Sequence, residues 1–444
     1  MPMDDKGRNV IVRRQKALED KTYRQRRSHK RRLLSWKQRS LSKFQPSVHI
    51  WKDTRSVSLL YKILSSNESY CTDTIKIPKR FSFYDSHDDC VDVFTHLAAS
   101  LYHHTKELCI DFSECEDISV STMSLMYILV KDYFTSLGKG KKKAKLTKFT
   151  VNPPSKIDDL RVMKYLKIFD FYDYKDFKDA DGEFLKLNVL SGKFRGSYFE
   201  NRKATAAKQI VEFINQSYLP AKKILSKKGR NLFEGLTNEM LNNAEDHSIK
   251  NETWYVSGVT FHDSNKDADL LELNLTILNF GDSFFEGFEH TKHENAENYQ
   301  KLEKLFSHHQ KQFKHKHHFE KESLFTLYML NEGISRLKYE DPSRGNGTMP
   351  FLKAFSDLED KGPQDKKYRS VLKIITGHTT LSCDSDVVPY GEDEKHLQIS
   401  LNKEKDFLKL PESQYLQYHS KYFPGSFIEC KVFLNKNLVD QKNG

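Results

Sequence analysis

From residue 73 onwards, short apolar runs alternate with longer segments in which apolar residues recur every three or four positions. The first pattern is typical of buried strands and the second of helices that pack on one side. The expected strands are 73–83, 106–112 and 145–151, and the expected helices are 90–104, 119–138 and 156–171. Strands that alternate with helices predict an α/β layer structure.

A second region predicts helices packed on a sheet. Its expected helices are 204–219, 231–247, 324–338 and 349–359, and its expected strands are 270–280, 371–384 and 425–434. An insertion rich in Lys and His, 282–323, interrupts it. We therefore expect an N-terminal arm and linker over 1–72, one domain over 73–180 and another over 190–440.

The positive charge of the chain lies at one end. Residues 1–45 contain 15 Lys and Arg against 4 Asp and Glu, which accounts for the whole net charge of +11. Pro46 would end any helix in this arm, and its apolar residues are too few for a core face. The arm is interpreted either as a segment that binds nucleic acid or an acidic partner, or as a solvated tail.

Other features concern the compartment. No run reaches about 18 apolar residues, and the N-terminus lacks the apolar core of a signal peptide. The six cysteines form no CxxC pair, which favours reduced thiols over a zinc site. We expect a cytoplasmic protein with no membrane association.

The helix 231–247 carries polar residues at a spacing that suits nucleotide chemistry. Glu239, Asn243 and Asp246 stand at i, i+4 and i+7, so they share one face. An amide oxygen can bind Mg²⁺, and a carboxylate can take a proton from an attacking water or hydroxyl. An apolar stripe lies beside them, formed by Phe233, Leu236, Met240 and Ala244. Taken alone, this spacing also fits a helix with a solvated polar side.

Two further motifs follow that helix. At 279–281, Asn-Phe-Gly ends an apolar strand, where a polar side chain can bind a ligand base and a glycine lets the ligand approach the backbone. At 344–348, Arg-Gly-Asn-Gly-Thr precedes a helix that begins near Thr348, and free N–H groups there suit phosphate. By itself, each motif also fits an ordinary turn or cap.

Together these motifs resemble the GHKL superfamily, which includes gyrase-type topoisomerases, heat-shock chaperone ATPases, histidine kinases and anti-sigma-factor kinases. Segment 237–248 resembles its N box, 279–284 its G1 box and 344–351 its G2 box. Segment 423–433 is similar to its closing Gly-Thr strand, with Gly425 and Ser426 at the matching positions. The resemblance covers about 200–436 and implies ATP and Mg²⁺ as cofactors.

The resemblance also implies roles for single residues. Glu239 would be the general base, Asn243 the magnesium ligand, and Asp246 a neighbour of the ribose and phosphates. Asn279 replaces the Asp that accepts a bond from the adenine amino group in the family, and its amide oxygen can still accept without charge. The other expected ATP-binding residues are Gly281, Arg344, Gly345, Gly347, Thr348 and Ser426. The insertion, including the His-rich run 308–318, is interpreted as a mobile, basic ATP lid.

The first domain resembles the STAS fold of anti-anti-sigma factors. Segment 109–129 is similar to the family's strand, loop and helix, and Asp111, Ser113, Ile118 and Ser121 match. In the family this loop can carry the hydroxyl that accepts a phosphoryl group, which makes Ser121 the candidate. Ser119, Val120 and Thr122 depart from the pattern. The alternative, which these departures favour, is that Ser119 or Ser121 caps the following helix.

The predicted fold class is therefore α/β: a STAS-like α/β domain followed by a GHKL (Bergerat) α/β sandwich, with a basic N-terminal arm. The leading function is an ATP-binding regulatory switch with weak ATP hydrolysis, which engages a protein partner or a second copy in a homodimer. The alternatives are a Ser/Thr protein kinase of the anti-sigma-factor type and a nucleic-acid-binding ATPase clamp. Likeness of fold alone does not choose among them.

Overall fold

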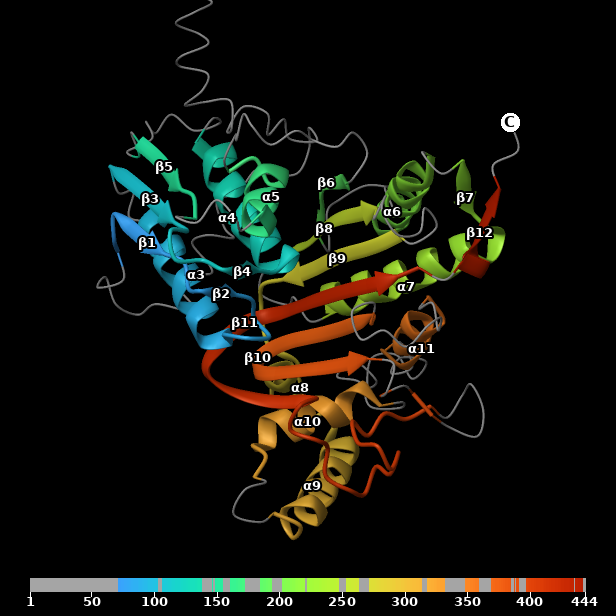
Figure 1. The fold of residues 1–444 in the computed structure, drawn as a ribbon. Helices are drawn as coiled ribbons and strands as arrows, with labels where there is room; N and C mark the ends of the chain where they lie inside the picture. The colour runs from blue at the N-terminus through green and yellow to red at the C-terminus, as the bar shows by residue number, and fades with distance from the viewer. Residues whose placement is uncertain are drawn as a thin grey trace, which may run out of the picture.

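The computed structural model describes residues 71–441, except for the gaps 103–105, 138–145, 147, 155–159, 172–183, 194–201, 220–221, 247–252, 263–270, 314–317, 332–347, 359–368, 385–386, 388, 391–396 and 435. The basic arm and the first four residues of the predicted G2 box lie outside the described residues. The described fold is mixed α/β and consists of two units packed against each other (Figure 1). No helix in the described part of the chain is long and apolar enough to cross a membrane.

The N-terminal unit is built on a small parallel sheet. Its elements are β1 (Thr74–Lys76), β2 (Arg80–Phe81), α3 (His87–Tyr102), β3 (Glu107–Asp111), β4 (Asp117–Ile118), α4 (Val120–Leu137), β5 (Lys148–Asn152) and α5 (Leu160–Ile168). The strand order is β1-β3-β5, all parallel, so α3 and α4 serve as the crossovers that parallel pairing requires. The predicted strand 73–83 divides around Pro78, and β2 pairs separately with β4.

The helix α4 is buried on all sides over most of its length. Every residue from Val120 to Lys131 is buried, including three hydroxyl residues in the first two turns, Ser121, Thr122 and Ser124. A helix of this kind needs apolar neighbours all round. It has them because it contacts α3 and α5 of its own unit and also β8 and β9 of the second sheet.

The C-terminal unit is a five-stranded sheet with helices on one face (Figure 1). The strand order is β10-β11-β9-β8-β6, and all the pairs are antiparallel. The helices α6, α7 and α11 pack on that face, and β7 pairs with β12 beside them. The elements are β6 (Phe184–Lys193), α6 (Arg202–Tyr218), β7 (Lys223–Leu225), α7 (Lys227–Asp246), β8 (Thr253–His262), β9 (Leu271–Asn279), α8 (Phe284–His290), α9 (Ala296–Gln310), α10 (Lys321–Leu330), α11 (Thr348–Leu358), β10 (Val371–Asp384), β11 (Leu416–Phe433), the 3-10 helix η4 (Lys436–Leu438) and β12 (Val439–Gln441).

Both faces of this sheet are apolar, because each face belongs to a different core. Side chains alternate along a strand, so Ile277 packs with the helices while Leu278 packs with the N-terminal unit. In the same way Ile428 faces the helices and Phe427 the N-terminal unit. The N-terminal unit and the C-terminal sheet therefore share one core, on the face of the sheet opposite α6 and α7.

Two strands of the five-stranded sheet were not predicted. β6 begins at Phe184, between the two expected domains, and forms the edge strand beside β8. β8 was also not predicted. Its run Thr-Trp-Tyr-Val-Ser-Gly-Val-Thr-Phe-His lacks strict polar alternation, because β8 contributes side chains to both cores.

The predicted lid is, in its described part, folded. Residues 284–310 form α8 and α9, whose apolar residues Phe288 and Leu302 are buried in the core with Phe325 of α10. These residues of the insertion are therefore helical and packed, and the interpretation of the insertion as a mobile lid stays a prediction. That interpretation was based on the many Lys and His residues of the insertion. The fold of the segment depends instead on its apolar residues at helical spacing. Residues 314–317 of the His-rich run lie outside the described residues.

Candidate functional site

The helix α7 places the predicted N box against the core. Its apolar stripe is buried as expected, with Phe233, Leu236, Met240 and Ala244 each no more than 2% exposed. Phe233, Leu236 and Met240 each contribute about 1.5–3 kcal/mol when fully buried, so the rotation of α7 about its axis is well determined. Glu239 is half-buried at the edge of this stripe.

The other two N-box residues are placed only by their backbone. Asn243 and Asp246 lie in the last turns of α7, and their side chains lie outside what the structure describes. Ala244, which follows Asn243, is described and is 2% exposed. Its carbonyl oxygen is the point at which α7 is tied to the sheet.

The side chain of Asn279 joins three of the predicted motifs. Its Nδ2 donates to the carbonyl oxygen of Ala244 at 2.6 Å. Its Oδ1 accepts from the backbone N–H of Ser426 at 2.9 Å and from the Ser426 hydroxyl at 2.5 Å. Asn279 and Ser426 are also paired in register between β9 and β11. The end of the N-box helix, the start of the G1 segment and the closing strand therefore meet at one amide.

These bonds fix the orientation of the amide and its chemistry. A carbonyl can only accept and a backbone N–H can only donate, so Nδ2 must face Ala244 and Oδ1 must face Ser426. An Asp here would bring two acceptor oxygens against each other beside Ala244. This gives a physical reason why Asn stands where the resembled motif has Asp.

The same bonds bear on the expected adenine contact. Asn279 is fully buried, and its oxygen already accepts two hydrogen bonds from Ser426. In this arrangement, both hydrogen bonds that the oxygen accepts come from the protein itself. Recognition of a base by Asn279 stays a prediction, and it requires one of the two bonds from Ser426 to be given up.

Gly425 lets β11 approach the G1 segment closely. It adopts φ of +107°, which L side chains rarely do. A Cβ there would overlap the carbonyl oxygen of Asn279 and lie 2.9 Å from the backbone nitrogen of Gly281. Gly281 thus lies directly beside β11.

A threonine that the sequence analysis missed ties the next helix to the same place. The Thr376 hydroxyl of β10 donates to the Gly425 carbonyl at 2.9 Å and accepts from the Phe284 N–H, the first residue of α8, at 3.0 Å. Ser283 and Glu286 complete a capping box at the start of α8. The Ser-x-x-Glu spacing of Ser283 and Glu286 indicates a capping box from the sequence alone, whereas nothing in the sequence marks the role of Thr376.

The G2 segment is described only from its helix onwards. Arg344, Gly345 and Gly347 lie outside the described residues, and Thr348 is the first residue of α11. α11 packs against α7 and contributes Leu352, Phe355 and Leu358 to the core. The helix that follows the glycines therefore lies beside the N-box helix.

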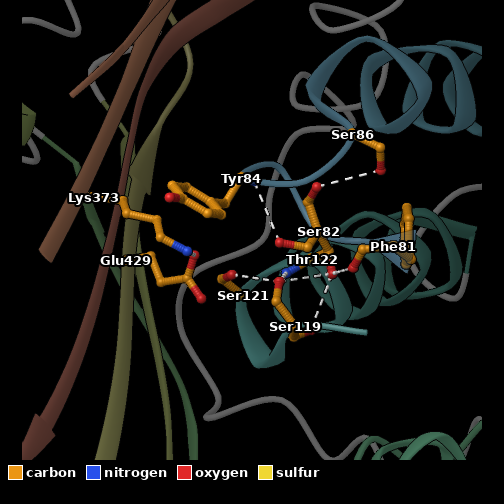
Figure 2. A network of polar contacts seen from close by, with 9 residues as sticks. All are labelled: Phe81, Ser82, Tyr84, Ser86, Ser119, Ser121, Thr122, Lys373 and Glu429. Atoms are coloured by element: carbon orange, nitrogen blue, oxygen red, sulfur yellow. Dashed lines mark hydrogen bonds and ion pairs between the residues drawn. The ribbon is translucent and has the colours of Figure 1, made fainter. Parts of the chain in front are cut away.

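The candidate phospho-acceptor lies in a buried hydroxyl cluster at the start of α4 (Figure 2). Ser119 Oγ accepts from the Thr122 N–H at 3.1 Å and lies 2.8 Å from Ser121 Oγ, so Ser119 caps the helix. Thr122 Oγ1 donates to the Phe81 carbonyl at 2.7 Å. Ser121 is 1% exposed. The capping alternative is confirmed for Ser119, and phosphorylation of Ser121 stays a prediction that requires the two units to separate.

An ion pair faces the N-terminal unit from the sheet, and the sequence analysis missed it. Lys373 of β10 and Glu429 of β11 are cross-strand partners with 3.9 Å between Nζ and Oε2 (Figure 2). Their side chains are 16% and 13% exposed, and Lys373 Nζ lies 4.1 Å from the ring centroid of Tyr84. The available signal was a charged residue in the middle of each apolar strand.

Two cavities lie away from the predicted N, G1 and G2 boxes, and residues of the insertion 282–323 line part of both. One of about 600 Å³ lies between the start of α3 and the start of β11, and one of about 660 Å³ lies beside it along residues 410–414. Within the described residues, no group of three or more His, Cys, Asp and Glu side chains is arranged to hold a metal ion. Comparison with protein-family models, curated proteins and solved structures finds no match for this chain.

Proposed function

We propose that the C-terminal unit binds magnesium and ATP in the manner of the GHKL superfamily, and that the chain is a nucleotide-dependent regulatory switch. The observation that carries this proposal is the Asn279 amide, which bonds to Ala244 of α7 and Ser426 of β11. Three motifs that are far apart in the sequence meet there. Along the chain they follow the order of the boxes that they resemble. The packing of α11 on α7 adds the fourth.

The donor chemistry of the residues fits such a ligand. Glu239 is half-buried at the edge of the apolar stripe, so its carboxylate can act on a nucleophile next to the helix. Asn243 follows one turn later and would supply an amide oxygen to the metal, which when bound neutralises charge on the phosphates. Asp246, Gly281 and Thr348 would contact the nucleotide, with Arg344, Gly345 and Gly347 at its phosphates.

The buried Asn279 changes one assigned role. Its oxygen and that of Ser426 would support the wall of the pocket from behind, because both are used in the bonds between β9 and β11. Affinity would then depend more on phosphate and metal contacts than on the base. We therefore expect weak discrimination between adenine and other purine bases.

Hydrolysis or nucleotide sensing is favoured over phosphorylation of the chain's own STAS-like unit. The Ser121 hydroxyl is buried, and the nearby Ser124 Oγ donates to Ser257 Oγ of β8 at 3.2 Å. A kinase reaction on Ser121 in the same molecule would first have to break the core shared by the two units. A protein partner, or a second copy of the chain, remains the expected recipient of any signal.

Titration calorimetry with magnesium and a non-hydrolysable ATP analogue tests the proposal. Wild-type protein is expected to bind saturably, and Asn243→Ala is expected to bind at least about 10-fold more weakly, since one ligand to the metal is lost. Asn238→Ala is the matched control, because it removes the same amide from a half-buried position on the same helix. Equal affinity for all three proteins would remove the N-box assignment, and no binding by the wild type would remove the proposed function.

A further inference from the structure

The strand β11 carries a bulge just before its closing-strand residues. Thr376 of β10 pairs with Ser426, but Gly377 pairs with Phe423 and Thr379 with Tyr418, so β11 holds extra residues between its paired positions. Pro424 and Gly425 account for the first of these shifts, and residues 419–422, His-Ser-Lys-Tyr, account for the second; we call 419–422 the bulge. Bulges of this kind redirect side chains out of the regular ladder. Here the groups of residues 419–422 are directed toward two other parts of the molecule.

The N-terminal part of α3, in the N-terminal unit, binds one side of the bulge. Asp88 accepts from the Lys421 N–H at 3.0 Å and from the Ser420 hydroxyl at 2.6 Å. His87 Nε2 donates to the Lys421 carbonyl at 3.1 Å, and Asp92 forms an ion pair with Lys421 Nζ. Hydrogen bonds that involve a charged group are about twice as strong as neutral ones. Both backbone groups of Lys421 are thus held by α3.

The candidate site holds the other side of the bulge. The Tyr422 hydroxyl donates to Glu286, whose carboxylate also accepts from the backbone N–H of Ser283 in the capping box of α8. Ser283 lies two residues after Gly281. Further along β11, Gly425 accepts from Thr376, and Ser426 donates to Asn279. The bulge therefore lies between α3 and the residues that position the G1 segment.

We propose that Asp88 is a positioning residue for the nucleotide site, and that the N-terminal unit regulates nucleotide affinity through the β11 bulge. The inference rests on the proposed function. A shift of α3 would displace Lys421, and with it Tyr422, Gly425 and Ser426. The neighbours Lys421 and Tyr422 transmit the shift, because Lys421 is bound to α3 and Tyr422 to Glu286 of α8. The charge of Asp88 matters because two donors converge on its carboxylate.

The test compares Asp88→Ala with Asp89→Ala in the full chain. Both changes remove a carboxylate from the first turn of α3, so the effect on the helix dipole is matched. Asp89 is exposed, whereas Asp88 holds the bulge. With magnesium and the non-hydrolysable ATP analogue, Asp88→Ala is expected to bind about 10-fold more weakly and Asp89→Ala as wild type. Asp88→Asn, which keeps one acceptor oxygen for the Lys421 N–H, is expected to fall between them.

Amide hydrogen exchange without nucleotide separates the two proposals. In Asp88→Ala, exchange is expected to accelerate at 279–286 and 425–427 as well as at the bulge, and in Asp89→Ala at none of these. This result would support the link even if the wild type bound no nucleotide, which would overturn only the proposed function. Acceleration confined to the bulge, or equal affinities for the two variants, would overturn the link. If Asp88→Ala does not fold, Asp88→Asn against Asp89→Asn decides the question by the same measures.

Discussion

The imidazole rings of His87 and His419 lie face to face, with 3.9 Å between their centroids and 11° between their planes. Nε2 of His87 donates to the Lys421 carbonyl, so the proton of the neutral ring lies on that nitrogen. Nδ1 is buried and has no hydrogen-bond partner among the described residues. Burial, followed by repulsion from His419, lowers the pKa of His87 to about 3. His378 adds to this shift and Asp88 opposes it.

Acid is therefore expected to destabilise the contact between the two units. In the unfolded chain His87 has a pKa near 6.5, so between pH 3 and pH 6.5 the unfolded state binds a proton that the folded state does not. Stability is lost as the pH falls through this window, by about 2 kcal/mol at pH 5 from this residue alone. Urea unfolding at pH 7 and pH 5 measures the loss. His87→Gln should reduce the loss, while His293→Gln, at an exposed position, should leave it unchanged.

The Asn279 amide predicts an unusual response to its nearest acidic analogue. Asn279→Asp replaces the donor to Ala244 with an acceptor and buries a charge, so we expect a loss of about 3 kcal/mol at pH 7. The loss of stability relative to wild type should become smaller as the pH is lowered to 5, because a protonated carboxyl can again donate to the carbonyl of Ala244. Thermal unfolding at both pH values checks this. Asn238→Asp, on the half-buried side of α7, should show neither effect, and a fully stable Asn279→Asp protein would contradict the network.

Two glycines should respond in opposite directions to the same substitution. Gly425→Ala places a Cβ against the carbonyl of Asn279 at positive φ, where backbone cannot give way cheaply, and should cost at least about 2 kcal/mol. Gly235 lies inside α7 with no atom within 4 Å of a Cβ added there, so Gly235→Ala should stabilise by about 0.5–1 kcal/mol. Denaturant midpoints of the two variants decide this. A neutral Gly425→Ala would show that β11 does not approach the G1 segment as closely as described.

The elements that the sequence predicted well are those whose apolar residues form a long run or recur at regular spacing. The stripe from Phe233 to Ala244 is buried as predicted, because this side of α7 faces the core while Asn231 and Gly235 are exposed. α4 was also predicted, because its apolar run is long and ends near Gly138. β6 and β8 were not predicted. Each contains a Ser-Gly pair, Ser191-Gly192 and Ser257-Gly258, and such pairs are typical of turns.

For the site, the sequence indicated which segments belong together but not the bonds that join them. Gly425 and Ser426 were marked beside Asn279 by motif order, and the structure pairs Ser426 with Asn279 in register. The direction of the amide bonds could not be foreseen, because it depends on the carbonyl of Ala244, a backbone group with no sequence signal. The hydrogen bond from the Lys421 backbone N–H to Asp88, 333 residues away, is equally invisible, since every residue except proline has such a donor.

Glu239 is the residue that separates nucleotide binding from turnover. Its half-buried place on α7 is one turn before Asn243, so it would act on the nucleophile while other groups hold the nucleotide. Glu239→Gln keeps the shape of the side chain but removes the base, and general-base assistance contributes about 10²–10⁴-fold in rate. The variant is expected to bind the ATP analogue as wild type does while phosphate release falls by at least about 100-fold.

Phosphate release and protein phosphorylation are measured together on wild type and Glu239→Gln, with nucleotide affinity as the control. A kinase also needs a base for the attacking hydroxyl, so loss of transfer instead of hydrolysis would assign the alternative activity to the same residue. Glu234→Gln, one residue before Gly235 on the same helix, is the matched control and should keep the wild-type rate. Wild-type rates in Glu239→Gln would remove Glu239 as the base. If the wild type binds nucleotide but shows neither activity, the C-terminal unit senses nucleotide without turning it over, and regulation through Asp88 would then act on affinity alone.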